Sequence, residues 1–254
     1  MLLEGKKGLV LNVMNKNSIG WAVAEFARQH GAQVGVGAQN ERMLKNVTEL
    51  TAGDKGYDIF TIDFAFEDQY EQLRKQVEEK YGKIDFLVHT AAFSPKDGLT
   101  GKFMDVSLES FQAAIHISCF SLVQLCKALE PVMNDNASVM AMSYLGGVRA
   151  CRNYNTMGVA KAALESSVRY LAVDLGPRGI RVNTISPGPM NTVAARGVPG
   201  LLNMINYVAE TAPLKRAAVQ EDVGGAAVYL MSDLSKGVTG QVIYVDAGYN
   251  IIAI

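Results

Sequence analysis

Short apolar runs alternate with longer amphipathic stretches along the whole chain, and this alternation constrains the fold more than any other feature. The apolar runs, which are expected to form buried strands, lie at residues 8–13, 33–37, 58–62, 84–89, 137–143, 181–185 and 241–245. The amphipathic stretches, which are expected to form helices, lie near residues 19–30, 40–51, 67–81, 107–130, 153–175, 201–210 and 221–231. Strands that alternate with helices pair in parallel and are covered on both faces. The sequence therefore predicts an α/β fold, a doubly wound parallel sheet with helices on both faces and ligands beyond the carboxyl ends of the strands.

The composition predicts one globular domain and excludes several classes of partner. The 254 residues suffice for a single domain with a large core, and no Pro-, Gly- or Ser-rich linker divides residues 1–254. A formal net charge of −1 argues against nucleic acid or an anionic membrane as partner. The three cysteines, Cys119, Cys126 and Cys151, are too few for a disulfide framework. Without a signal peptide or an uncharged apolar run of spanning length, the expected location is cytoplasmic.

Residues 143–161, SYLGGVRACRNYNTMGVAK, bring two tyrosines and a lysine close together. Tyr144 follows a predicted strand, and Tyr154 and Lys161 are seven residues apart in a predicted helix. Seven residues are nearly two turns, so these side chains share a helix face about 10 Å apart along the axis. A nearby cation favours the phenolate and makes the hydroxyl a better proton donor to a developing oxyanion. The pairing is suited to reduction of a carbonyl or of an activated double bond.

The junction after the first predicted strand, LVLNVMNKNSIGWAVAEFA, has features of a dinucleotide site. Ser18 is suited to cap the helix that Ile19 and Gly20 open, and a helix N-terminus accepts a diphosphate. The pattern G-x-G-x-x-G is absent, so an ordinary strand–loop–helix connection is the alternative interpretation.

The ends of the second and third predicted strands bear on the choice of nicotinamide cofactor. Gln39 stands where an acidic residue often bonds the ribose 2′-hydroxyl of NAD. No immediate Arg–Lys pair is present for a 2′-phosphate, although Arg42 and Lys45 lie nearby. We therefore expect NADH rather than NADPH. Asp63 is placed to accept a hydrogen bond from the adenine amino group, or else is an ordinary acid that leads into a helix.

The fourth predicted strand ends in HTAAFSP, which combines small residues with a histidine and an aromatic ring. Thr90, Ala91 and Ala92 leave room for a nicotinamide ribose beside the backbone, and Phe93 is placed to line a substrate pocket. His89 is catalytic by residue type, but a lone histidine that ends an apolar strand is more often structural.

A rigid Pro-Gly-Pro turn follows the sixth predicted strand, where Thr192 is placed to bond the diphosphate.

Several motifs of the chain together resemble the short-chain dehydrogenase/reductase family: Tyr154, Lys161, VNTISPGP and the tail TGQVIYVDAG. Most members have the tyrosine and lysine four residues apart. This chain is similar to the divergent enoyl-acyl carrier protein reductases of fatty-acid biosynthesis in its seven-residue spacing and in the motifs SYLG, NYNTMGVAKAALE, SIG and ARGV. The resemblance covers essentially the whole chain.

This resemblance implies a Rossmann-like fold and a specific reaction. NADH would deliver hydride to the β-carbon of a trans-2-enoyl thioester carried by acyl carrier protein or coenzyme A. Tyr154 would hydrogen-bond the thioester oxygen as the enolate forms, and Lys161 would hold the nicotinamide ribose. Tyr144 would supply a second, pocket-lining hydroxyl. The family also implies a homotetramer built through the long central helices.

The resemblance assigns further positions to the cofactor and to the substrate, and no metal site is expected. The cofactor positions are Ser18, Ile19, Gln39, Asp63, Phe64, Thr90, Ala91, Ala92, Lys161, Gly188, Met190 and Thr192. The substrate positions are Phe93, Tyr144, Tyr154, Met157, Ala194, Ala195, Val198 and Met204. Residues 192–206 would form a flexible flap over the acyl pocket.

Three positions depart from the family pattern. Asn12 and Ala92 stand where glycines usually follow the first and fourth strands, and Pro187 replaces a smaller residue. The first two add bulk beside the expected cofactor. Three alternatives therefore stay open: an enoyl-coenzyme A reductase, a short-chain carbonyl reductase or alcohol dehydrogenase, and a non-catalytic nucleotide-binding protein. A carbonyl reductase is expected to use a serine ahead of the tyrosine, but here Tyr144 follows Ser143.

Overall fold

The computed structural model describes residues 1–192 and 195–253, which form a parallel sheet with helices on both faces. The sheet has seven strands in the order β3-β2-β1-β4-β5-β6-β7. Their bounds are β1 Lys7–Leu11, β2 Gln33–Ala38, β3 Tyr57–Thr61, β4 Ile84–His89, β5 Met133–Met142, β6 Arg181–Pro187 and β7 Val242–Val245. All six neighbouring pairs are parallel, as buried β-branched and leucine-rich runs predict. The predicted Rossmann-like architecture is confirmed.

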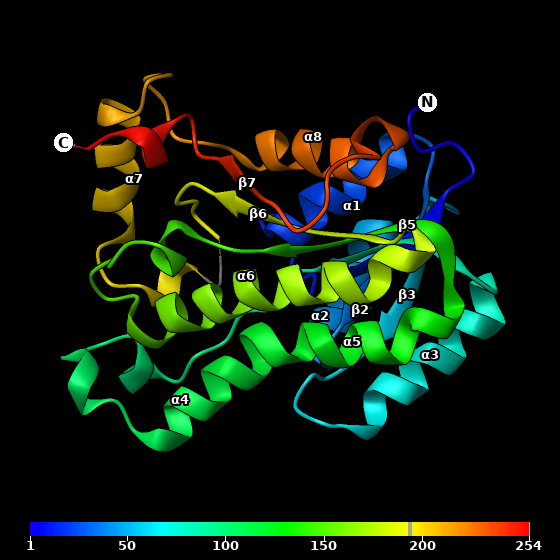
Figure 1. Cartoon of the computed structure of the whole chain (residues 1–254), viewed down its shortest axis with the longest axis horizontal. Coiled ribbons are helices and arrows are strands. Elements are labelled where there is room, and N and C mark those ends of the chain that lie inside the picture. Colours follow the sequence, from blue (N-terminus) through cyan, green and yellow to red (C-terminus); the bar gives the residue numbers. More distant parts are fainter. Residues whose placement is uncertain (193–194, 254) are drawn as a thin grey trace.

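Two helical layers cover the sheet (Figure 1). The helices are α1 Ile19–Gln29, α2 Glu41–Thr51, α3 Asp68–Tyr81, α4 Leu108–Ile115, α5 Ser121–Leu129, α6 Asn155–Leu175, α7 Leu201–Thr211 and α8 Gln220–Met231. Side chains of α1, α2 and α8 share one apolar core with the sheet, and those of α3, α5 and α6 share the other. α7 stands apart from both layers, beside the C-terminus (Figure 1).

The structure divides the predicted helix 107–130 into two α-helices. α4 and α5 are joined by a π-helical turn over His116–Phe120. Within it the Ser118 hydroxyl contacts the backbone of Phe93, and the Ser121 hydroxyl donates to the Ile117 carbonyl at 2.8 Å. A π turn adds one residue to the helical ladder without changing its direction, so hydrophobic periodicity does not reveal it.

The segment Leu108–Val132 is long and apolar enough to cross a membrane by length and composition. In the fold it packs instead against the protein, because buried side chains of α5 such as Leu122 and Leu125 belong to the core shared with α3 and α6. Core packing thus accounts for the apolar side chains of α5, while Leu108 at the start of the segment remains exposed.

Candidate active site

A cavity of about 380 Å³ opens at the carboxyl ends of the central strands. The loops that follow β1, β4, β5 and β6 all contribute to its wall, together with α6 and α7. This is where a doubly wound sheet places its ligands. The predicted site residues that line the cavity are Ser18, Ile19, Thr90, Ala92, Phe93, Tyr144, Tyr154, Met157, Lys161, Gly188, Met190, Thr192, Ala195, Val198 and Met204.

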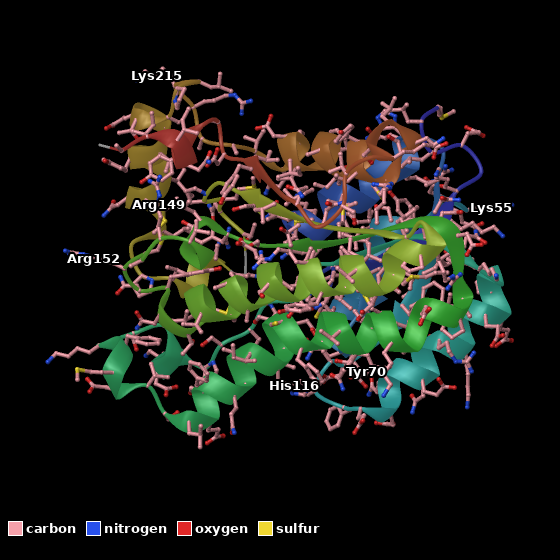
Figure 2. The ribbon with its side chains drawn as sticks, viewed as in Figure 1. Lys55, Tyr70, His116, Arg149, Arg152 and Lys215 are labelled. Carbon is pink, nitrogen blue, oxygen red and sulfur yellow. The ribbon has the colours of Figure 1, made fainter. Side chains whose placement is uncertain are left out.

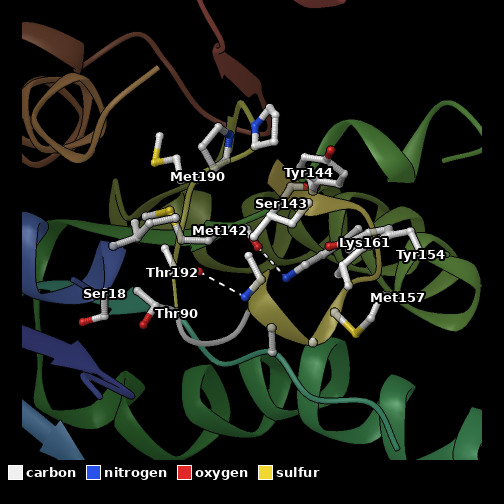
Figure 3. A pocket seen from close by; sticks show the side chains of 18 of the residues that line it. Ser18, Thr90, Met142, Ser143, Tyr144, Tyr154, Met157, Lys161, Met190 and Thr192 are labelled. Atoms are coloured by element: carbon white, nitrogen blue, oxygen red, sulfur yellow. Dashed lines mark hydrogen bonds between the residues drawn. The ribbon is translucent and has the colours of Figure 1, made fainter. Parts of the chain in front are cut away.

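Two tyrosines form one wall of this cavity (Figure 3). Tyr144 directly follows β5 and Ser143, while Tyr154 is the residue that caps α6. Their ring centroids lie 4.8 Å apart at an interplanar angle of 59°. The Tyr144 hydroxyl donates to Met204 Sδ of α7 at 3.0 Å. The pair therefore presents two phenols from loops that the sequence separates by ten residues.

Tyr154 remains a neutral phenol in this setting. Burial raises its pKa above the usual value, and Tyr144 and Cys151 raise it further. Removal of the phenol from water is the largest influence on this pKa, and the effect of the Lys161 ammonium on the phenol stays a prediction. A neutral phenol keeps the proton with which it donates to an oxyanion.

Lys161 reaches the cavity from the second turn of α6. It is 3 % exposed, and its Nζ donates to the Met142 carbonyl at 2.7 Å (Figure 3). Burial lowers the pKa of its ammonium to about 8, while Cys119 and Glu165 act in the opposite direction. Near neutral pH the side chain is therefore still a cation.

Ser143 lines the cavity, but its hydroxyl is engaged with a carboxylate. This side chain is 4 % exposed and donates to Oε1 of Glu165, a buried carboxylate on α6. A hydroxyl that is committed to a carboxylate makes a strong, charge-assisted bond. The oxygen-bearing groups beside Lys161 that remain for a substrate are thus the two phenols.

The N-terminus of α1 provides a place for a diphosphate. Ser18 caps the helix by accepting from the Trp21 amide at 3.2 Å, and no acid occupies the first turn. A methyl group added at Gly20 would lie 2.9 Å from Thr90 Oγ1, so β4 approaches the helix too closely for a side chain. Ser18, Ile19 and Gly20 all line the cavity. An uncrowded, positively polarised helix end fits the diphosphate of a dinucleotide.

The two departures beside the expected cofactor have different structural effects. Asn12 has φ of +69°, a left-handed conformation that glycine and asparagine adopt most readily. It therefore preserves the backbone turn of a glycine while adding an amide to the cavity wall. Ala92 also lines the cavity and adds only a methyl group.

The segment that begins at Thr192 closes the cavity from the α7 side. Thr192 Oγ1 accepts from the Ala195 amide at 3.1 Å (Figure 3). Asn153 Nδ2 donates to the Pro199 carbonyl at 3.2 Å and so ties this segment to the loop before α6. Ala194, predicted to contact the substrate, lies outside the described residues.

Four predicted cofactor residues do not line this cavity. Phe64 and Ala91 are each 2 % exposed and their side chains pack in the core, so only their backbone groups are left for a cofactor, and their assignment stays a prediction. Residue type alone did not show that they face away from the strand ends. Gln39 donates to Asp63 across neighbouring strand ends at 3.1 Å, outside the cavity but at the expected edge of the sheet.

Several cavity residues were not singled out from the sequence, among them Met14, Leu99 and Leu201. Met14 and Leu99 lie in loops that follow β1 and β4. The rule that ligands bind at the carboxyl ends of strands would have selected both loops. Leu201 opens α7, and no local pattern marks it as facing the cavity.

The fold and the cavity define a dinucleotide-dependent oxidoreductase of the short-chain dehydrogenase/reductase type. A family model described as enoyl-(acyl carrier protein) reductase matches residues 13–250. The chain belongs to the enoyl-(acyl carrier protein) reductase family. It is 47 % identical over 251 residues to the NADH-dependent enoyl-acyl-carrier-protein reductase FabI of Rickettsia typhi, covering 99 % of this chain and 96 % of the relative.

Solved structures of the same kind are also similar. A Bacillus cereus enoyl-acyl carrier protein reductase in complex with NADP+ and indole naphthyridinone superimposes with a TM-score of 0.97 and is 40 % identical, with coverage of 100 % of this chain and 99 % of that one. The Anaplasma phagocytophilum enzyme in complex with NAD gives a TM-score of 0.95 at 40 % identity, with coverage of 100 % and 97 %. The family interpretation made from the sequence is confirmed.

Proposed function

We propose that this protein is an NADH-dependent enoyl-acyl carrier protein reductase of fatty-acid biosynthesis. The observation that carries the proposal is the cavity wall in which Tyr144, Tyr154 and Lys161 meet while Ser143 is engaged elsewhere. The names of the relatives support NADH as cofactor. The helix end at Ser18 has the chemistry to receive its diphosphate.

The bound nicotinamide supplies hydride to the β-carbon of the enoyl thioester. Tyr154 donates a hydrogen bond to the thioester oxygen, where negative charge develops, and the enolate then takes a proton at its α-carbon to complete the reduction. Its raised pKa suits this role, because the proton stays on the phenol until the oxyanion forms. Tyr144 lies beside it and provides a second hydroxyl at the same wall.

Lys161 orients the nicotinamide ribose. An ammonium has three donor hydrogens, and the Met142 carbonyl takes one of them. Two donors remain, which match the two hydroxyls of a ribose. The charge also favours the developing oxyanion across the cavity.

A carbonyl reductase is the second candidate function, and the engagement of Ser143 argues against it. That chemistry needs a serine hydroxyl at the substrate oxygen, whereas Ser143 donates to Glu165. A non-catalytic nucleotide-binding protein is disfavoured because both tyrosines and the lysine face the same cavity. That alternative was raised because Asn12 replaces a glycine, but Asn12 keeps a left-handed backbone conformation that glycine adopts readily.

The test follows NADH and NADPH absorbance with three substrates: crotonyl-acyl carrier protein, crotonyl-coenzyme A and a β-ketoacyl thioester. We expect turnover with NADH and the crotonyl carrier protein. Turnover only with the ketone would establish the carbonyl reductase instead. Tight NADH binding without turnover of any substrate would leave the non-catalytic function.

The carrier protein is the expected donor of the substrate because the relatives are named for it, and basic residues flank the cavity. Arg152 precedes Tyr154 by two residues, and Arg196 lies between the cavity residues Ala195 and Gly197. Arg152 projects from the α7 end of the molecule (Figure 2), whereas Arg149 donates to the carbonyls of Asn250 and Ile252. Both carriers hold the acyl group on a phosphopantetheine arm, whose phosphate a guanidinium binds. Because both carriers share this arm, the guanidinium contact serves either of them, and the preference for the carrier protein comes from the names of the relatives.

We further propose a homotetramer in the cytoplasm, with residues 192–206 as the flap that admits the acyl chain. Large apolar side chains remain exposed on the layer that contains α4 and α6: Leu108 is 72 %, Tyr170 is 73 % and Val173 is 74 % exposed. Such patches are typical of subunit interfaces. Light scattering of wild type and Val173→Glu tests the assembly, which the charged variant is expected to dissociate.

A further inference from the structure

Glu165 is a buried carboxylate that the proposed reaction does not use. It is 6 % exposed and lies one helical turn after Lys161 on α6. Residues four apart lie on the same side of a helix, so both charges face the end of β5. Buried carboxylates are costly unless they are paired or hydrogen-bonded. The position therefore requires an explanation.

Lys161 and Glu165 hold two consecutive residues at the end of β5. Lys161 donates to the Met142 carbonyl at 2.7 Å, and Glu165 accepts from the Ser143 hydroxyl. Tyr144 is the next residue along the chain. These two hydrogen bonds fix the backbone at the end of β5, directly before Tyr144.

We propose that Glu165 is a positioning residue, which fixes the turn before Tyr144 and supplies the negative charge that keeps Lys161 an ammonium beside the nicotinamide ribose. This inference rests on the proposed function, since it assigns Lys161 to the ribose. The two roles of the Glu165 carboxylate can be tested separately, because its hydrogen bond acts on Ser143 and its charge acts on Lys161.

The groups around Lys161 support the charge role. Cys119 of the π-helical turn raises the pKa of Lys161, and Lys161 in turn lowers the pKa of His89 on β4. Burial raises the pKa of the Cys119 thiol, so the thiol is neutral at physiological pH. Burial also keeps His89 neutral, because its pKa falls to about 3. Of the groups in the described chain that raise the pKa of Lys161, Glu165 is the carboxylate.

The groups around Glu165 are equally defined. Ser143 donates to it from the end of β5, and Gly147 approaches it closely from the turn after Tyr144. Tyr244 of β7 feels its charge, because burial and Glu165 both raise the pKa of that phenol. The nearby cation is Lys161, so removal of the carboxylate is felt first at the ammonium.

The test measures NADH affinity as a function of pH, by fluorescence titration of wild type, Glu165→Gln and Ser143→Ala. Glu165→Gln keeps an oxygen for Ser143 but loses the charge. Its loss of affinity at high pH is expected to begin about one pH unit lower than in wild type, giving about tenfold weaker binding near pH 9. Ser143→Ala retains the charge, so its pH profile is expected to match wild type while its kcat falls.

Asp174→Asn is the matched control, because it removes an exposed carboxylate from the same helix and is expected to change neither quantity. Should Glu165→Gln not fold, Ser143→Ala/Glu165→Met leaves no unpaired polar group and is expected to show the same pH shift. A folded charge-free variant with the wild-type profile would overturn the inference. Because the titration needs no substrate, absence of enoyl turnover would overturn the proposed function separately.

Discussion

The rings of Tyr144 and Tyr154 lie 4.8 Å apart and face the same cavity, although one follows a strand and the other caps a helix. Their hydroxyls are not equivalent. Tyr144 donates to Met204, whereas Tyr154 has no protein partner for its hydroxyl among the described residues. The phenol without a partner is the one that is free to serve a substrate oxygen, which makes the two tyrosines experimentally separable.

Tyr154→Phe is expected to lower kcat about 10²–10³-fold with little change in NADH affinity. The phenyl ring preserves the packing against Tyr144, and the loss is that of one oxyanion donor. Stopped-flow absorbance of NADH with a crotonyl thioester measures it. Tyr229→Phe removes the hydroxyl of an exposed tyrosine on α8, away from the cavity wall, and serves as control. A kcat within a factor of three of wild type would remove Tyr154 from the oxyanion role.

Lys161→Met is expected to abolish tight NADH binding while it stabilises the cofactor-free protein. A pKa that falls from 10.5 to about 8 corresponds to about 3 kcal/mol of destabilisation at neutral pH, and loss of the bond to Met142 returns about 1 kcal/mol. We expect Tm to rise by about 4 °C at pH 7.

The difference in unfolding free energy between Lys161→Met and wild type is expected to depend on pH. Between pH 8 and 10.5 the unfolded chain binds a proton at Lys161 that the folded chain has lost, so wild-type stability gains on the variant as pH rises. Calorimetry at pH 7 and pH 10 measures both differences. An equal advantage of the variant at the two pH values would contradict the assigned burial cost.

His89 is expected to make the protein sensitive to acid. Burial lowers its pKa from 6.5 to about 3, with Lys161 contributing, so the unfolded chain binds the extra proton between these values. Stability is therefore complete above pH 6.5 and falls by about 5 kcal/mol as pH approaches 3. His89→Gln, which retains a donor for Ser121, is expected to flatten this limb in urea titrations.

Asn12→Gly is expected to leave the free energy of unfolding within a few tenths of a kcal/mol, whereas Asn12→Ala costs about 1 kcal/mol. The reason is the φ of +69°, which alanine adopts at a cost that glycine does not pay. Urea unfolding of both variants measures the difference. Asn17→Ala, in the same loop, is the comparison; if it lost as much stability as Asn12→Ala, backbone strain would not be the cause.

Periodicity and residue type predicted the sheet, because most of its strands contain a short apolar run that needs no distant information. They did not place Tyr154 correctly within a helix. Asn153 and Asn155, with φ of +62° and +31°, form a turn on either side of it, so α6 begins only at Asn155. Left-handed asparagines are tolerated but not required by the sequence, which is why the boundary could not be predicted.

The residues of the site could be predicted from the sequence, but their hydrogen bonds and pKa values could not. Tyr144, Tyr154 and Lys161 were found from their spacing, and all three line the cavity. The bond from Ser143 to Glu165 joins residues 22 positions apart, which no local pattern connects. The shift in the Tyr154 pKa depends on burial, a property of the assembled layers.

The bond between Ser143 and Glu165 also bears on how this fold changes its chemistry. If no hydroxyl in the cavity were held by a hydrogen bond to the protein, substitutions on the cavity surface alone could change the substrate class of a reductase. Here the serine that a ketone reductase would need is held by an acid behind the wall. A designer, or a lineage under selection, would have to replace Glu165 before Ser143 became useful, so the barrier between the two activities lies in the interior of the protein.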